Sequence, residues 1–169
     1  SNRSPNGIIS SPHPDKKPIS IDKQLHLNTN RYFFPYLCPM LSKSERTRAH
    51  ILEKVAPVFN MKGYFGTSLA DITTAIGLSK GSVYGNFKSK EALAIEAFNY
   101  NLGKVIFPLA DRINAETTAT AKMNSITAYY RQYYATTMPT GGCPILNVGI
   151  DANNQNPALT TRVQYVIQR

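Results

Sequence analysis

Residues 67–93 read TSLADITTAIGLSKGSVYGNFKSKEAL, and the spacing of their serines, glycines and apolar residues predicts short helices joined by tight turns. Ser68 and Asp71 have the S-x-x-D spacing of a helix N-cap, in which the two side chains satisfy free backbone amides. The apolar residues at 69, 72 and 76 share one helical face, and Gly77 then breaks the helix. This stretch therefore begins with one short amphipathic helix and a turn.

A second short helix follows that turn. Ser79 can cap it, and Val83 and Phe87 lie four residues apart, so both can point inward. The remaining positions leave small or hydrogen-bonding side chains on the outer face: Lys80, Gly81, Ser82, Tyr84 and Asn86. Two helices packed steeply across a tight turn are typical of a helix-turn-helix, whose second helix lies in the DNA major groove. The pattern predicts a helix-turn-helix over 68–87.

Positive charge is concentrated around this pair of helices. From Lys43 to Lys90 the chain carries eight basic and three acidic residues, a net charge of +5 out of +9 for all 169 residues. Cations flank both ends of the pattern: Lys43, Arg46 and Arg48 before it, Lys88 and Lys90 after it. Such cations suit the phosphates beside a groove-bound helix, although surface lysines also serve solubility alone.

Longer helices are predicted on both sides. Ser42 and Glu45 have the S-x-x-E form of a capping box, and the apolar face over residues 51–59 is expected to end at Gly63. Ser89 caps a later helix whose apolar side is expected to stop near Pro108, because proline lacks the amide that helix continuation needs. The sequence therefore predicts an all-α fold.

The region 106–169 is helical again but less regular. Glycines 141–142 interrupt it, Cys143 precedes a further apolar segment, and Asn156 with Pro157 can cap a last helix. That helix has no stop signal before Arg169, so we expect the chain to be truncated within a longer protein.

Two features of this region could serve binding. A row of tyrosines, whose aromatic rings end in hydroxyl groups, suits a semi-polar organic ligand. With the nearby cysteine, these tyrosines are the residues predicted to bind a ligand: Tyr129, Tyr130, Tyr133, Tyr134 and Cys143. The alternatives are a tyrosine core, and for Cys143 either a buried apolar role or redox sensing. The histidines at 13, 26 and 50 are remote from Cys143, so the sequence does not predict an enzyme. No spacing supports a metal site or another cofactor.

Residues 1–39 contain six of the eleven prolines and no helical period, so they are expected to be a disordered extension. A native basic arm that follows DNA phosphates is the alternative. The two cysteines, at 38 and 143, are too few for a disulfide framework, and neither a membrane-length apolar run nor a signal-peptide pattern occurs. We therefore expect a cytoplasmic protein with no membrane contact.

The run 67–93, with the preceding Val-Phe-Asn-Met-Lys-Gly-Tyr at 58–64, resembles the DNA-binding domain of the TetR/AcrR family of bacterial transcriptional regulators. The resemblance covers about residues 44–105. It implies an N-terminal three-helix DNA-binding domain, with a recognition helix at 80–87, followed by a helical effector-binding and dimerisation domain, here partial at 106–169. The positions that it implies contact DNA are Arg48, Thr67, Ser68, Ser79, Lys80, Gly81, Ser82, Tyr84, Asn86 and Lys90. Asn86 stands where the family often has His, and Gly85 is a weak helix former.

This resemblance implies a regulator, most simply a repressor, that a small-molecule effector releases from a palindromic operator. The full-length protein is expected to be a homodimer, and the 169-residue chain alone a monomer or prone to aggregation. Residues 141–147 also resemble a C-terminal signature of one branch of the family. The alternative is a ligand- or redox-sensing interaction module that does not bind an operator independently.

Overall fold

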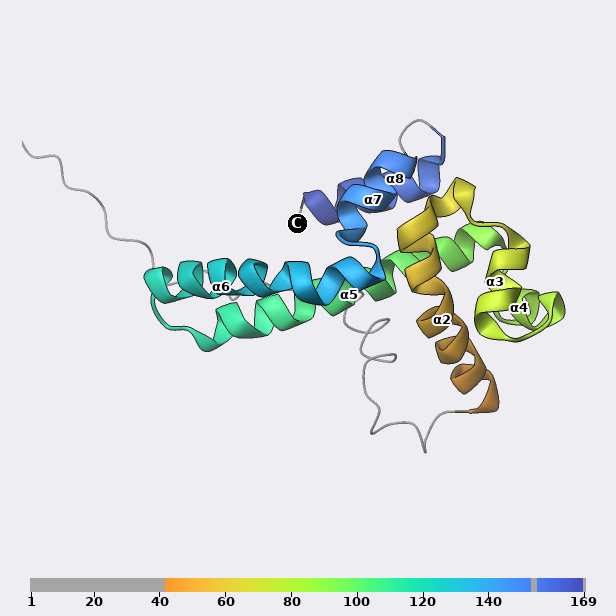
Figure 1. Ribbon diagram of the computed structural model, residues 1–169, viewed down its shortest axis with the longest axis horizontal. Coiled ribbons are helices and arrows are strands. Elements are labelled where there is room, and N and C mark those ends of the chain that lie inside the picture. Colours follow the sequence, from red (N-terminus) through yellow and green to blue (C-terminus); the bar gives the residue numbers. More distant parts are fainter. Residues whose placement is uncertain (1–41, 153–154, 169) are drawn as a thin grey trace, which may run out of the picture.

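The computed structural model describes residues 42–152 and 155–168, and these residues form helices and no strand (Figure 1). In chain order the elements are α2 (Lys43–Gly66), α3 (Leu69–Ile76), α4 (Lys80–Asn86), α5 (Lys90–Ala115), α6 (Ala119–Thr137), the 3-10 helix η2 (Met138–Thr140), α7 (Pro144–Ala152) and α8 (Pro157–Ile167). The predicted all-α class is confirmed. The prediction for residues 1–39 lies outside the described residues. None of the described helices is both long and apolar enough to cross a bilayer.

The predicted cap at the start of α2 is present. Ser42 Oγ accepts a hydrogen bond from the Glu45 amide at 3.2 Å, and the Glu45 carboxylate accepts one from the Ser42 amide at 3.0 Å. Near the other end, Gly63 has φ +73°, which interrupts the helical backbone at the position predicted from the sequence. A side chain there would meet the Asp151 carboxylate, because a Cβ would lie 2.5 Å from Asp151 Oδ1. Glycine therefore serves both a left-handed turn and a close approach to α7.

The helix-turn-helix follows the predicted plan. Ser68 and Asp71 form a capping box at the start of α3. Gly77 ends that helix in the left-handed conformation, with φ +65°, and its amide donates to the Thr73 carbonyl at 3.0 Å. Ser79 then caps α4 by accepting from the Ser82 amide at 3.3 Å. Local side-chain caps thus determine where both short helices begin.

The predicted end of α5 near Pro108 is wrong, because the helix continues to Ala115. Pro108 cannot donate to the carbonyl four residues earlier, yet α6 packs along this half of α5 and holds it helical. Beside the proline, the Tyr129 hydroxyl of α6 donates to the Val105 carbonyl at 2.7 Å. As a result, α5 runs through the predicted domain boundary at 105/106, and the two predicted domains share one continuous helix.

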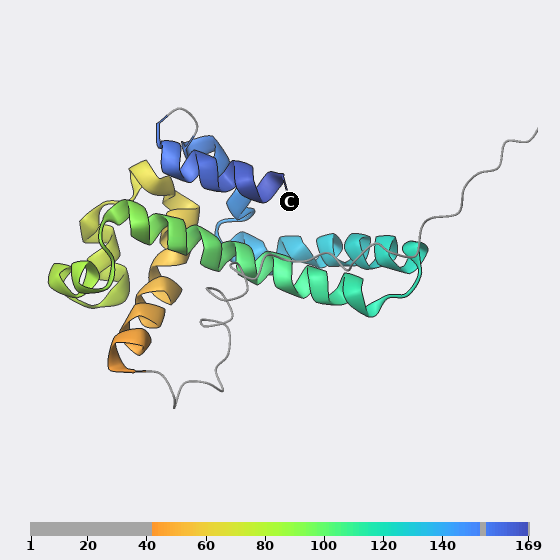
Figure 2. The same cartoon turned by 180° about the vertical axis from the view of Figure 1, so that it is seen from behind.

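The core lies where α2, α3, α4 and α5 meet, and a second layer of α7 and α8 covers α2 and α5 (Figures 1 and 2). Its buried residues include Ile51, Leu52, Val55, Phe59, Ile72, Ile76, Val83, Phe87, Leu93 and Phe98, joined by Val148, Ala152, Leu159 and Val163 from the second layer. The distal halves of α5 and α6 lie side by side and project away as an arm (Figure 2). The short helices α3 and α4 therefore sit at the opposite end of the molecule from this arm.

The predicted cap of the last helix is also confirmed. Asn156 Oδ1 accepts from the Leu159 amide at 3.0 Å, with Pro157 in the first turn of α8. The same asparagine is buried, and its Nδ2 donates to Glu91 Oε2 at 3.1 Å. One side chain therefore caps α8 and ties it to the first turn of α5.

Candidate nucleic-acid interface

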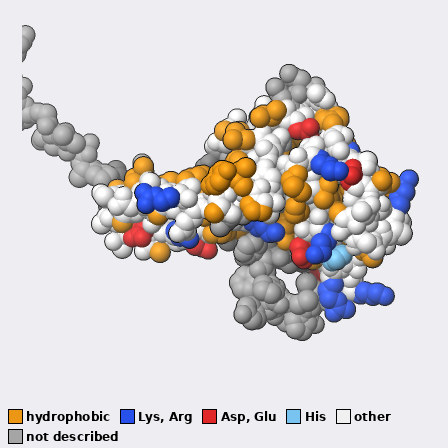
Figure 3. Space-filling view, in the orientation of Figure 1, with side chains coloured by type: hydrophobic (Ala, Val, Ile, Leu, Met, Phe, Trp, Pro, Cys, Tyr) orange, Lys and Arg blue, Asp and Glu red, His pale blue; other side chains and the backbone are white. Residues whose placement is uncertain are grey.

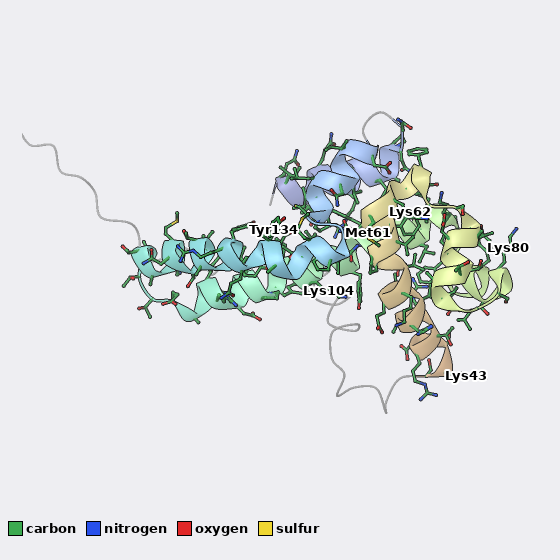
Figure 4. The ribbon with its side chains drawn as sticks, in the orientation of Figure 1. Lys43, Met61, Lys62, Lys80, Lys104 and Tyr134 are labelled. Atoms are coloured by element: carbon green, nitrogen blue, oxygen red, sulfur yellow. The ribbon has the colours of Figure 1, made fainter. Side chains whose placement is uncertain are left out.

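The helix α4 presents one buried and one exposed face. Val83 and Phe87 are buried at 1% and 2% exposure and fasten α4 to the platform formed by α2, α3 and α5. Lys80 and Tyr84 lie on the other face, where Tyr84 is 44% exposed and the Lys80 ammonium lies 5.9 Å from the centre of the Tyr84 ring. Figure 4 shows Lys80 pointing outward at the edge of the molecule. This exposed face of α4, with the Lys80 ammonium and the Tyr84 phenol, is called the α4 ridge below.

Several predicted contact residues are hydrogen-bonded within this motif. Ser79 Oγ and Ser82 Oγ lie 3.4 Å apart, and Asn86 Nδ2 donates to the Ser82 carbonyl at 2.8 Å. Ser68 donates its hydroxyl to Asp71 Oδ2 at 2.6 Å, although the residue stays exposed. Gly81 is exposed and leaves the backbone accessible beside Ser79. These side chains shape the surface of the motif while remaining at or near solvent.

Arg48 does not project toward the α4 ridge. Its guanidinium donates to the Asn86 carbonyl at the end of α4, forms an ion pair with Glu96 of α5, and lies 4.1 Å from the centre of the Phe87 ring. These contacts engage the Arg48 guanidinium, which is predicted from the sequence to contact a DNA phosphate. Arg48 therefore holds the end of α4 against α2 and α5.

Thr67 is predicted to contact DNA, but the structure buries it. The residue is fully buried, at 0% exposure, and its hydroxyl donates to the Gly63 carbonyl at 2.6 Å. A phosphate cannot reach it in this arrangement. Its role here is to close the turn between α2 and α3, which the sequence could not show because Thr also suits an exposed helix start.

Lys90 begins α5 with its ammonium 4.5 Å from the centre of the Tyr64 ring. Burial lowers the pKa of Lys90, while the carboxylates of Asp151 and Asp71 act in the opposite direction. The side chain is partly exposed and lies beside the turn that leads out of α4. It is thus a cation at the edge of the ridge, steadied by an aromatic ring.

The exposed cations lie at the outer margin of the helix-turn-helix end. Lys43, Arg46, Lys80 and Lys88 are all exposed. Figure 3 shows blue side chains along this margin, and Figure 4 places Lys43 at the free end of α2 and Lys80 on α4. Asp71 stays ionised, because the hydrogen bond from Lys62 at 2.6 Å, followed by those from Ser68, holds its carboxyl pKa below the usual range, and the paired Lys62 ammonium balances its charge. The margin therefore presents positive charge.

The candidate ligand tyrosines on α6 do not form one cage. The rings of Tyr129, Tyr130 and Tyr133 lie in contact, with centres 5.5–6.0 Å apart, but Tyr130 and Tyr134 are 53% and 72% exposed. Tyr133 lies against Cys143, and burial together with that neighbour raises the pKa of Tyr133. Figure 4 shows Tyr134 and Lys104 on opposite sides of the α5–α6 pair. Cys143 is a free thiol of intermediate burial.

Among those candidates, Tyr129 lines a cavity that has a volume of about 160 Å³ and lies where α2, α5, α6 and the η2–α7 turn meet. Ten residues line it: Pro57, Asn60, Asn101, Lys104, Val105, Tyr129, Thr137, Thr140, Gly142 and Pro144. The α2 and α5 members could not be predicted from the sequence, since nothing in their spacing indicates that they meet α6. Within the described ranges, no group of three His, Cys, Asp or Glu side chains could hold a metal ion.

Beside the cavity, a polar joint fastens α7 to α2. Asn60 is buried, and its Nδ2 donates to the carbonyls of Thr140 and Gly142 at 2.8 and 3.0 Å. Asn147 Nδ2 donates in turn to the Asn60 and Gly141 carbonyls, at 3.0 and 2.5 Å. A Cβ on Gly141 would lie 2.8 Å from Met61, and its φ is +94°. The segment 141–147 therefore packs closely against α2 and is hydrogen-bonded to it.

A carboxylate completes the joint. Asp151 Oδ2 accepts from the Tyr64 amide at 2.6 Å, at the turn that Gly63 opens. The ring of Tyr64 lies under the Lys90 ammonium. Asp151, near the end of α7, thus contacts Tyr64, and Tyr64 contacts Lys90, the predicted phosphate contact. These contacts connect the second layer to the helix-turn-helix.

A buried three-helix platform that carries an exposed helix and a basic margin is the architecture of helix-turn-helix DNA-binding domains. Residues 51–97 match the family model described as "Bacterial regulatory proteins, tetR family". The crystal structure of a TetR-family transcriptional regulator from Cytophaga hutchinsonii is similar, with 45% identity, a TM-score of 0.67, and coverage of 76% of this chain and 64% of that chain. A TetR transcriptional regulator from Chloroflexus aurantiacus J-10-FL has 37% identity, a TM-score of 0.69, and coverage of 76% and 65%.

One similar curated protein is the HTH-type transcriptional repressor DhaR of Mycobacterium sp. (strain GP1), 28% identical over 127 residues, or 72% of this chain and 60% of DhaR. This chain thus spans three-fifths of DhaR and somewhat less than two thirds of each solved structure. The helix-turn-helix, the family-model match over residues 51–97 and the structural similarity together make this chain similar to the tetR family of bacterial regulatory proteins.

Proposed function

We propose that this chain is a DNA-binding transcriptional regulator whose helix α4 enters the major groove of an operator. The arrangement of α4 carries the proposal, because Val83 and Phe87 are buried while Lys80 and Tyr84 face solvent. A helix about 10–12 Å across fits a major groove about 12 Å wide. The ridge can therefore dock without rearrangement of its platform.

The contact residues divide into two groups. Lys80 and Ser82, near the start of α4, are proposed to reach base edges, where a lysine can donate to guanine acceptors and a hydroxyl to several bases. Tyr84, Asn86 and Lys90 are proposed to hold the phosphate backbone, together with the caps Ser68 and Ser79 and the exposed backbone at Gly81. Arg48 and Thr67 act indirectly in this scheme, because their side chains hold α4 and the α2–α3 turn in place.

Repression, dimerisation and effector release belong to the whole regulator. In a symmetric dimer two copies of α4 would enter successive major grooves about 34–36 Å apart, which requires a palindromic operator. Exposed apolar side chains across α7 and α8 (Figure 3), such as Leu146, Ile150 and Ile167 at 63%, 78% and 66% exposure, support self-association on that face. A small molecule that prefers a different α4 spacing would release the operator. We place this activity in the cytoplasm.

The test is a fluorescence-anisotropy titration of the chain against a labelled duplex selected from a random library, repeated over a range of salt concentrations. We expect the selected duplex to be bound at least about tenfold more tightly than a scrambled duplex, as base-specific contacts of about 1–3 kcal/mol each require. Equal, weak affinity for both duplexes would favour the alternative, a sensing module without independent operator binding.

Variants separate the two kinds of contact. Lys90→Ala should weaken binding to both duplexes and reduce the salt slope by about one unit, because one phosphate contact is lost. Lys80→Ala should mainly reduce the preference for the selected duplex. The matched control is Lys122→Ala on α6, which removes the same charge away from the ridge. A Lys90→Ala variant that changed base preference and kept the slope would contradict this division of roles.

A further inference from the structure

We infer that the cavity where α2, α5, α6 and the η2–α7 turn meet is a binding site for a small aromatic carboxylate, with Lys104 as the partner of the carboxylate group. The inference gives a ligand class to the effector of the proposed function, and its effect on DNA binding rests on that function. The binding event itself can be tested without DNA.

The size and walls of the cavity suit one ring. Its volume is about 160 Å³, and an apolar cavity of about 150 Å³ holds a benzene molecule. Apolar surface comes from Pro57, Val105 and Pro144, and from the ring of Tyr129. A single aromatic ring can therefore fill the space.

The one charged residue of the cavity lining is the cation Lys104. No carboxylate in the described part of the chain lies within ion-pair distance of its ammonium. Glu53 acts on Lys104 at longer range, and its own carboxylate lies 3.6 Å from the Lys54 ammonium. Lys104 as a whole is exposed, but desolvation by its neighbours lowers the pKa of its ammonium, which lies 4.4 Å from the centre of the Tyr100 ring. A bound anion would supply the charge partner that the described residues do not.

Four of the other polar side chains around the cavity donate to backbone carbonyls. The Tyr129 hydroxyl donates to Val105 at 2.7 Å, and the Thr140 hydroxyl donates to Thr137 at 2.9 Å. The Asn101 amide group donates to Ala56 at 2.7 Å, and that of Asn60 donates to the η2–α7 turn. Recognition of a ligand's charge therefore depends on Lys104, and an anion is favoured over a neutral molecule of the same shape.

The cavity also borders the polar joint between α2 and α7. Its lining includes Asn60 of α2 and the two residues, Thr140 and Gly142, whose carbonyls accept from Asn60. A ring in the cavity thus contacts both sides of the joint that connects the second layer to the helix-turn-helix. A ligand that binds one geometry of this joint more tightly shifts the population toward that geometry.

The direct experiment is isothermal titration of the chain with sodium benzoate, with benzamide as the neutral ligand of similar shape and acetate as the carboxylate without a ring. We expect saturable benzoate binding, at least about tenfold weaker binding of both benzamide and acetate, and about a tenfold loss of benzoate affinity in Lys104→Met. The matched variant Lys122→Met should bind benzoate as the unmodified chain does. Unaltered thermal melting of both variants establishes that they fold.

Equal benzoate affinity in Lys104→Met and the unmodified chain would overturn the inference, as would the absence of saturable benzoate binding. A second titration, of the selected duplex in the presence of benzoate, should show reduced DNA affinity that Lys104→Met abolishes. Lys104-dependent benzoate binding with unchanged DNA affinity would support the site and overturn its role in release. If the duplex is not bound even without benzoate, the proposed function fails while the calorimetric result on the site still stands.

Discussion

Replacement of Arg48 by Met distinguishes a residue that positions α4 from one that touches DNA. Arg48→Met keeps most of the aliphatic stem but removes the hydrogen bond to the Asn86 carbonyl, the ion pair with Glu96 and the contact with the Phe87 ring. All three contacts tie the end of α4 to the platform. We therefore expect the variant to fold, with α4 less firmly held.

The magnitude follows from how exposed the contacts are. A hydrogen bond to a charged group contributes about 1.5–3 kcal/mol, and a fully exposed ion pair about 0.2–1 kcal/mol. The Arg48 and Glu96 side chains are 29% and 31% exposed, which lies between these cases. The total loss in the free energy of unfolding should be about 2 kcal/mol. For a chain of this size that corresponds to a melting temperature roughly 4–8 °C lower.

Two measurements test this reasoning together. Thermal unfolding should show the drop in melting temperature, and anisotropy at several salt concentrations should show weaker duplex binding with an unchanged salt slope. A direct phosphate contact would instead reduce the slope by about 0.9 unit. The control Arg46→Met, two residues earlier and exposed, should leave the melting temperature within error. A reduced slope with unchanged stability in Arg48→Met would refute the positioning role.

Three further substitutions probe the backbone and a buried phenol. Gly85→Ala should raise the stability of α4 by up to about 1 kcal/mol in calorimetry, because its Cβ meets nothing within 4 Å, and an unchanged or lower melting temperature would contradict this. Gly63→Ala should destabilise by about 2 kcal/mol or more in urea unfolding, since φ is +73° and the new Cβ would collide with Asp151; a neutral result would mean that the turn relaxes freely. Burial, and secondarily the charge of Glu53, raises the pKa of Tyr100 to about 12. The protonated phenol therefore contributes its full stabilisation below the ordinary tyrosine pKa of about 10, and this stabilisation is lost as pH rises toward 12. Absorbance of the phenolate should place the transition there, and Tyr100→Phe should reduce the alkaline loss of stability.

Local signals predicted the helix starts and the helix-turn-helix correctly. Ser42, Ser68, Ser79 and Ser89 each accept from a backbone amide three residues later. A cap depends on residues within one turn of each other, so short-range spacing is sufficient to recognise it. The glycine that ends α3 is likewise a local requirement, because its left-handed backbone favours glycine whatever packs around it.

Contacts between distant residues decided what the spacing could not show. Pro108 lies inside α5 because α6 supports that helix from the side, although a proline on its own favours an end. Thr67 and Arg48 look like exposed contacts in the sequence, yet one is buried in a turn and the other reaches 38 residues along the chain to Asn86. Whether a polar side chain faces solvent depends on which elements pack beside it, and that is a property of the tertiary structure.

The same division holds for the candidate sites. The sequence by itself determined the all-helical class, the short helix α4 and its inward residues Val83 and Phe87, because a 3.6-residue period and local caps carry that information. It did not determine the ligand cavity, where Asn60, Lys104 and Tyr129 meet from three helices. Those three positions are separated by at least one intervening helix or turn, and only the packing of α2, α5 and α6 brings them within reach of one small molecule.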